Sequence, residues 1–132
     1  MSEERVHVAH DADIVAARKK ARELAALAGF TGSDLTMIAT AISEVARNII
    51  VYAEHGEIVL SVAQRGTKRG ITVVARDDGP GIANIDDAMK DGFSTHKSLG
   101  LGLPGARRLM DEFEIASAPG VGTTVTMTKW TR

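Results

Sequence analysis

The chain has 132 residues, 44% of them hydrophobic and 25% charged, and its formal net charge at pH 7 is −1, which is ordinary for a soluble protein of one domain, residues 1–132. A near-neutral chain without a basic stripe is not expected to bind nucleic acid, and the absence of cysteine excludes disulfides and thiolate metal sites. Without a signal-peptide segment or an apolar run long enough to cross a membrane, we expect a cytoplasmic protein.

The first segment predicts a strand followed by a helix. Val6 and Val8 alternate with polar neighbours, which indicates a short, half-exposed strand. Asp11 can cap a helix that runs to about Ala28, where Gly29 supplies a stop.

A second, strongly amphipathic helix is expected after Ser33. Apolar residues recur there at spacings of three and four, which is the period of one helix face. They are Leu35, Ile38, Ala39, Ile42, Val45, Ala46 and Ile49.

After residues 54–56 the hydrophobic pattern changes to period two, which predicts a β-hairpin. Residues 58–63 form its first strand, residues 64–70 a polar loop, and residues 71–75 its second strand. A short helix is expected at residues 85–89.

The C-terminal part predicts a helix and a final pair of strands. Pro104 suits the first turn of a helix ending near Asp111, and residues 113–117 and 123–130 have strand character. Because the strands come in hairpins rather than alternating singly with helices, we expect an α/β fold: a two-layer α/β sandwich with a mixed, largely antiparallel sheet and helices on one face.

Glu44 and Asn48 lie one turn apart on the second helix, on the flank shared by Met37 and Ala41. A carboxylate beside a carboxamide on a covered flank can order a hydrated Mg²⁺ ion. Taken alone, the pair is explained more simply by two solvent-facing side chains.

A second cluster, Asp-Asp-Gly-Pro-Gly-Ile at residues 77–82, directly follows a predicted strand. Its glycines allow close backbone approach, so a carboxylate held over this turn could accept a hydrogen bond from an amino group in an apolar pocket. An ordinary strand-ending turn has the same composition.

A third cluster, residues 91–105, is rich in glycine and leads into a helix. Glycines at a helix start expose backbone N–H groups, which suits phosphate, although a plain helix-entry turn is the alternative. The glycines also fit G-x-G-x-x-G, but the preceding segment is polar and residues 120–125 hold no ribose-binding acid, so a dinucleotide fold is rejected. Gly-Val-Gly-Thr-Thr at 120–124 is first of all a hairpin turn.

Four motifs follow one another along the chain: Glu-x-x-x-Asn on a helix, Asp-x-Gly-x-Gly after a strand, a Gly-x-Gly segment, and Gly-Thr on a strand. In this order they resemble the motifs of the ATPase superfamily of gyrase, Hsp90, histidine kinases and MutL. The resemblance covers about residues 40–124. Within that superfamily the chain is similar to the RsbT-type switch kinases, close to the anti-sigma-factor kinases. This narrower resemblance rests on residues 41–49, 91–95, 100–105, 108–113 and 129–130.

The resemblance implies a serine/threonine kinase that phosphorylates a STAS-domain protein of a stressosome and, when released, binds and activates a serine/threonine phosphatase. Its cofactors would be ATP and Mg²⁺. Asn48 would hold the Mg²⁺, and Glu44 would orient or deprotonate the attacking hydroxyl. Asp77 would accept from the adenine amino group, with Thr123 supporting it through water.

The resemblance also implies the remaining nucleotide-binding residues. Gly79 and Gly81 would shape the adenine floor, in the turn that ends at Ile82. The phosphates would be cradled at the glycine-rich helix start by Gly100, Leu101, Gly102 and Leu103. Lys97 or Arg47 could add positive charge near the γ-phosphate.

One departure and three alternatives remain. The family usually has glycine where this chain has Ser98, which puts the mobility of the phosphate-binding segment in doubt. A nucleotide-dependent anti-sigma factor that acts by stoichiometric binding would share the same pocket. A histidine-kinase fragment would need an adjoining helix with a phosphoacceptor histidine, and a decayed domain that only binds a partner would not need intact Glu44, Asn48 and Asp77.

Overall fold

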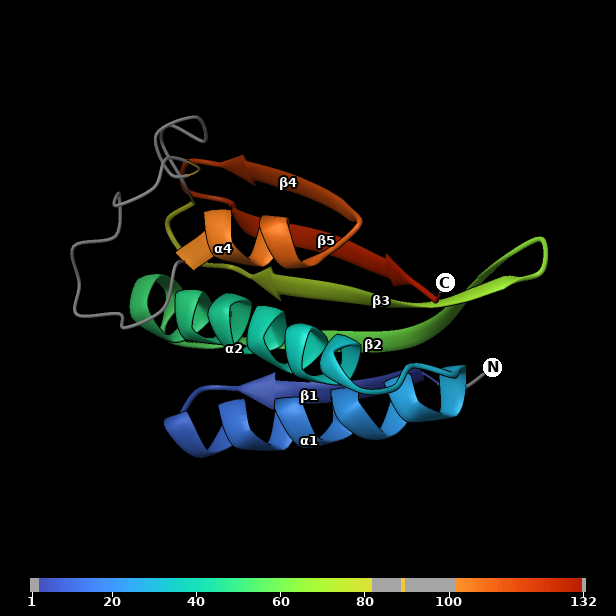
Figure 1. The fold of residues 1–132 in the computed structure, drawn as a ribbon. Coiled ribbons are helices and arrows are strands. Elements are labelled where there is room, and N and C mark those ends of the chain that lie inside the picture. The colour runs from blue at the N-terminus through green and yellow to red at the C-terminus, as the bar shows by residue number, and fades with distance from the viewer. Residues whose placement is uncertain (1–2, 82–88, 90–101, 132) are drawn as a thin grey trace.

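The computed structural model describes residues 3–81, 89 and 102–131, and its strands build one five-stranded sheet (Figure 1). The strands are β1 (Glu3–Val8), β2 (Gly56–Arg65), β3 (Lys68–Asp77), β4 (Glu112–Ala118) and β5 (Gly122–Trp130), in the spatial order β1-β2-β3-β5-β4. Every pairing between these strands is antiparallel, so the described part of the sheet is antiparallel throughout and not mixed.

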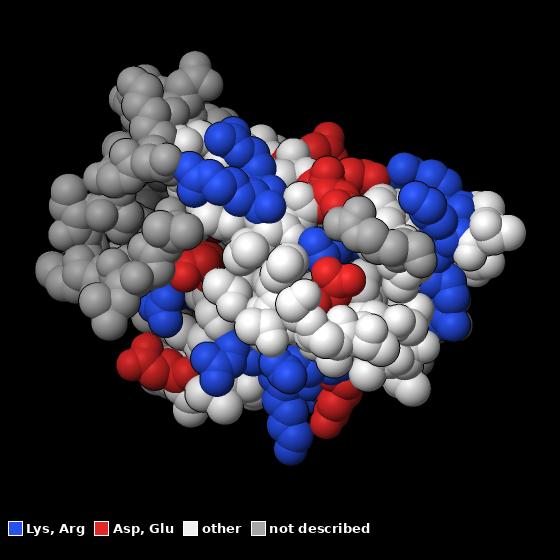
Figure 2. All heavy atoms as spheres, in the orientation of Figure 1, with Lys and Arg blue, Asp and Glu red and all other residues white. Residues whose placement is uncertain are grey.

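The helices α1 (Asp11–Ala28), α2 (Ser33–Ala53) and α4 (Gly102–Leu109) lie on one face of the sheet, which confirms the predicted two-layer sandwich (Figure 1). α2 lies between the other two helices and runs antiparallel to α4. The C-terminal end of α2 therefore meets the start of α4. Basic and acidic side chains are interspersed over this helix-bearing face, in keeping with the small net charge (Figure 2).

Both ends of α1 are fixed by local contacts, but not all of those that the sequence predicts. Gly29 ends the helix in the left-handed conformation, as expected. The N-cap is His10 and not Asp11, which is already helical. The carboxylate of Asp13 accepts hydrogen bonds from the backbone N–H groups of Ala9 and His10, at 2.9 and 3.0 Å. An acid one turn inside the helix thus bonds the N–H groups that precede it.

α2 is the central helix of the core, as its periodic apolar stripe predicts. Six of the seven predicted stripe residues are buried, and Leu35 packs against them from a half-buried position. The helix is apolar and long enough to pass for a membrane span by composition, yet half of that window is buried inside the protein. Its apolar character is therefore explained by packing against the sheet and both neighbouring helices.

The β2–β3 hairpin is longer than predicted, because its strands continue through the polar segment. Residues 64 and 65 pair with Arg69 and Lys68, which leaves only Gly66 and Thr67 in the turn. The polar side chains do not prevent pairing, since backbone hydrogen bonds form a ladder regardless of side-chain polarity.

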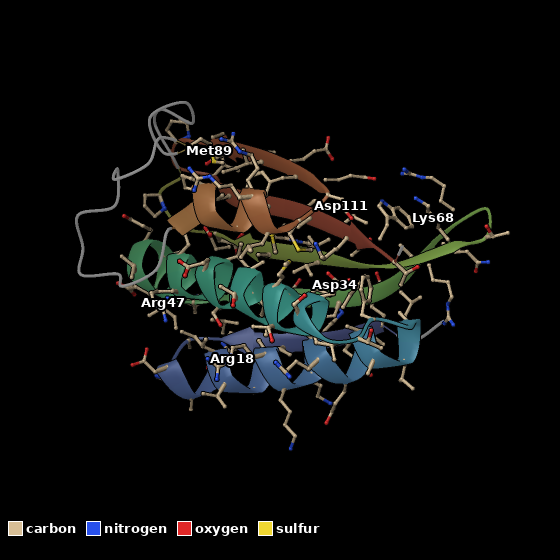
Figure 3. The ribbon with its side chains drawn as sticks, in the orientation of Figure 1. Arg18, Asp34, Arg47, Lys68, Met89 and Asp111 are labelled. Atoms are coloured by element: carbon tan, nitrogen blue, oxygen red, sulfur yellow. The ribbon has the colours of Figure 1, made fainter. Side chains whose placement is uncertain are left out.

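The C-terminal elements agree with the sequence within a few residues. α4 ends at Leu109, and β4 and β5 contain the two predicted strands. The helix predicted at residues 85–89 lies outside the described residues except for Met89, which is half-buried against the core (Figure 3).

Candidate active site

Asp77 and Thr123 lie directly opposite each other where β3 ends and β5 begins. Side chains alternate along a strand, so these two leave the sheet on the same face as the core residues Ala75 and Val125, which is the face that the helices cover. The strand order alone brings together two residues that are 46 positions apart in the sequence (123 minus 77). Thr123 is buried, and its hydroxyl lies 2.9 Å from that of Ser117.

Asp77 also lies against the C-terminal half of α2. The residue opposite it on β2 is Gly56, where an added Cβ would stand 2.9 Å from Ile49 Cγ2 and 3.1 Å from Asp77 Cβ. Ile49 follows Asn48 directly in α2. The acid at the end of β3 and the helix that carries Glu44 and Asn48 are therefore neighbours in the fold.

The turn after β3 is tightly packed, and its two glycines are needed for that packing. A Cβ at Gly79 would stand 2.5 Å from the Cβ of Ala53, the last residue of α2. Gly81 has a φ of 81°, and its Cβ would collide with the backbone of Ala118. The turn is thus fastened to α2 on one side and to the β4–β5 connection on the other.

Asp77 holds this turn and keeps acceptor capacity. Its Oδ1 accepts a 2.9 Å hydrogen bond from the backbone N–H of Gly79. A carboxylate offers about four acceptor positions, so the side chain remains able to accept from an external amino group. The predicted role of Asp77 toward adenine is compatible with this geometry.

Glu44 is buried, with only 6% of its surface exposed, so the simpler interpretation of a solvent-facing side chain is wrong for it. Its Oε1 accepts a hydrogen bond of 3.0 Å from the backbone N–H of Gly102, the first residue of α4. Its Oε2 lies 3.6 Å from Nη1 of Arg47, one turn further along α2. The carboxylate is therefore held between a helix N-terminus and a guanidinium group.

Asn48 is half-buried and lies one turn beyond Glu44 on α2. No group of three or more His, Cys, Asp or Glu side chains able to hold a metal occurs among the described residues. A single carboxamide oxygen suits an ion that fills its other positions with water and nucleotide phosphate, as Mg²⁺ does. Asn48 therefore fits the predicted ion.

Of the phosphate-binding residues predicted at the start of α4, the structure describes two. The Gly102 N–H is bonded to Glu44, while the Leu103 side chain belongs to the core, 4% exposed. Ile82, Lys97, Gly100 and Leu101 lie outside the described residues.

Asp77 also lines a cavity of about 310 Å³ that differs from the predicted nucleotide pocket. Its other lining residues are His7, His55, Gly56, Glu57, Arg76 and Asp78. Neither Asn48 nor Thr123 lines it, so Asp77 is the one proposed site residue that it shares among the described residues.

Two residues that support the site were missed by the sequence interpretation. Ala53 packs closely against Gly79. The Ser117 hydroxyl forms hydrogen bonds with the Thr123 hydroxyl and the Gly122 carbonyl. No local sequence signal marks either residue, since both act through contacts that form only when distant segments pack.

Comparison with known proteins places the whole arrangement in a family. A family model described as a histidine kinase-like ATPase domain matches residues 8–129. The chain is 50% identical over 128 residues, 96% of each chain, to the serine/threonine-protein kinase RsbT of Bacillus subtilis (strain 168). It is 34% identical over 104 residues to the anti-sigma F factor of Caldanaerobacter subterraneus, covering 76% of this chain and 73% of that one.

A solved structure gives the same result. The crystal structure of the RsbU and RsbW domains of a Mycobacterium tuberculosis protein matches with a TM-score of 0.65 and 25% identity. That match covers 100% of this chain and 33% of the other. The predicted fold class is confirmed.

Proposed function

The chain belongs to the histidine kinase-like ATPase domain family, and we propose that it transfers the γ-phosphate of ATP to a serine or threonine of a STAS-domain partner. The enzyme class, an ATP-dependent serine/threonine protein kinase, follows from this family and from the 50% identity to RsbT over nearly the full length. The substrate, a role in a stressosome and a cytoplasmic location are parts of the proposal.

The observation that carries the proposal is a buried carboxylate, Glu44, on a helix whose C-terminal half adjoins Asp77. Phosphoryl transfer needs positioning and charge neutralisation more than covalent chemistry from the protein. The residues around the C-terminal half of α2 and the end of β3 would provide both the positioning and the charge neutralisation.

The chain's own residues have distinct parts in this scheme. Asp77, fixed by the Gly79 N–H, accepts from the adenine amino group, and Thr123 supports it from the adjacent strand. Asn48 would hold Mg²⁺, which would supply positive charge to the phosphates. Glu44 orients the hydroxyl of the protein substrate and accepts its proton as the phosphoryl group is transferred.

After release from its substrate, the kinase is proposed to bind and activate a serine/threonine phosphatase. The similarity to anti-sigma F factors supports a partner-switching role, in which one surface is shared between competing partners. That same similarity supports the alternative that the chain acts as an anti-sigma factor through stoichiometric binding. ATP binding does not discriminate these functions, because both use the same pocket, whereas the captured partner does.

The test is to incubate the purified chain with labelled ATP, Mg²⁺ and each STAS protein of the same genome. We expect label on a serine or threonine of one STAS protein, and none when Glu44→Gln replaces the wild-type chain. A chain that binds ATP, labels no STAS protein and captures a sigma factor would overturn the kinase proposal in favour of the alternative.

A further inference from the structure

The Glu44 carboxylate lies beside two groups, a backbone N–H and a guanidinium, of the kinds that bind phosphate in proteins. One is the Gly102 N–H at the start of α4, 3.0 Å from Oε1, and the other is the guanidinium of Arg47, 3.6 Å from Oε2. Figure 3 shows Arg47 near the C-terminal end of α2, the end that faces the start of α4. Both donors converge on a carboxylate that is more than nine-tenths buried.

We propose that Arg47 binds the terminal phosphate of ATP, and that in the nucleotide-free chain Glu44 takes the place of that phosphate. This inference rests on the proposed kinase function, and what it adds is the exchange between Glu44 and the phosphate at Arg47. When ATP binds, Arg47 exchanges the carboxylate for a phosphate oxygen. Glu44 is then released from its cationic partner and is free to accept a hydrogen bond from the substrate hydroxyl.

The distances that this exchange requires are short enough for an arginine side chain to span. A hydroxyl bonded to Glu44 would be about 3 Å from the carboxylate, and the phosphorus about 3–3.5 Å further on. In the nucleotide-free chain, Nη1 of Arg47 lies 3.6 Å from the same carboxylate, and the long arginine side chain is 38% exposed. The phosphoryl group therefore falls within the range of its guanidinium.

The ion pair between Arg47 and Glu44 is also weak enough to be exchanged for phosphate. A separation of 3.6 Å is longer than the 2.7–2.9 Å typical of a charge-assisted hydrogen bond. Arg47 has five N–H donors, and Glu44 is its only salt-bridge partner among the described residues. The planar guanidinium forms two parallel bonds with phosphate, so the triphosphate offers it a better partner.

The simpler explanation is an ordinary ion pair between residues three apart on a helix, which contributes little to stability when exposed. It does not account for the burial of Glu44 or for the second donor on the same carboxylate. The two explanations predict different results for nucleotides that differ only in the terminal phosphate.

The experiment is calorimetric titration of Mg²⁺–ATP and Mg²⁺–ADP into the wild-type chain and the variants Arg47→Ala, Arg47→Lys and Arg22→Ala. Arg22 is an exposed arginine on α1 and serves as the matched control. For Arg47→Ala we expect at least about tenfold weaker binding of ATP, with ADP affinity within about twofold of the wild type. Arg47→Lys should be intermediate, because it keeps the charge and loses the two parallel bonds.

Equal effects of Arg47→Ala on ATP and ADP, or no effect on either, would overturn the role of Arg47 and leave the kinase proposal standing. A wild-type chain that binds neither nucleotide would overturn both. The ratio of ATP to ADP affinity is measured within each variant, so a general loss of folded protein does not imitate the expected result.

Discussion

The buried carboxylate of Glu44 accepts a hydrogen bond of 3.0 Å from the backbone N–H of Gly102, a residue 58 positions further along the chain. This bond joins α2 to the first turn of α4. It also places the proposed general base at the N-terminal end of α4. One contact thus joins the residue proposed as the base to the helix start that is proposed to bind phosphate.

Glu44→Gln should retain ATP binding and lose phosphoryl transfer. Glutamine keeps an oxygen that can accept from Gly102, so the fold and the pocket persist, whereas the proton acceptor is lost. General-base catalysis typically contributes 10²–10⁴-fold, so we expect transfer to a STAS substrate to fall by at least about 100-fold. Full transfer by Glu44→Gln, measured beside Glu23→Gln on α1, would show that Glu44 is not the base.

Asp77→Asn should weaken ATP binding by roughly ten- to one-hundred-fold, because a hydrogen bond to a charged acceptor contributes about 1.5–3 kcal/mol. Asp78→Asn is the matched control, since Asp78 is exposed and adjacent in sequence. Titration calorimetry of both variants measures the difference. If both variants bind ATP as tightly as the wild type, Asp77 does not recognise the nucleotide.

Gly79→Ala should destabilise the protein by about 1–3 kcal/mol, because the added Cβ would stand 2.5 Å from Ala53 Cβ. Replacing Ala53 by glycine removes one side of this clash. We therefore expect the double variant to lose less stability than the sum of the two single changes, measured as the free energy of unfolding in urea. Strict additivity would show that the turn and α2 do not contact each other.

Asp13 should make stability depend on acid pH. Hydrogen bonds from the Ala9 and His10 backbone, the former stronger, lower the pKa of Asp13 below its ordinary value of 3.8. A lowered folded-state pKa contributes stability that is present above about pH 4 and is lost as the pH falls through the folded-state pKa. Asp13→Asn should therefore be less stable than the wild type at neutral pH, and the gap should close on acidification.

Urea unfolding between pH 7 and pH 3 measures this gap, with Asp11→Asn as the control, since Asp11 lies in the same first turn and makes neither hydrogen bond. A constant gap across this range would mean that the ionised form of Asp13 is not favoured by folding.

Period and composition identified most elements because they are local properties. The three-and-four spacing in α2 and the left-handed stop at Gly29 are read directly from neighbouring residues. The errors arose where distant contacts outweighed local polarity. The segment at residues 64–70 has the composition of a loop, yet pairing with the opposite strand extends the hairpin through it.

The sequence by itself determined the elements and the candidate residues: an amphipathic helix with Glu44 and Asn48, and an acid ahead of a glycine turn. Only the tertiary structure decided that Glu44 is buried, that Asp77 faces Thr123, and that the turn after β3 rests on Ala53. The reason is physical. A residue's type and period depend on its neighbours in the chain, whereas its burial and bonding partners depend on which strands pair and which helix covers them.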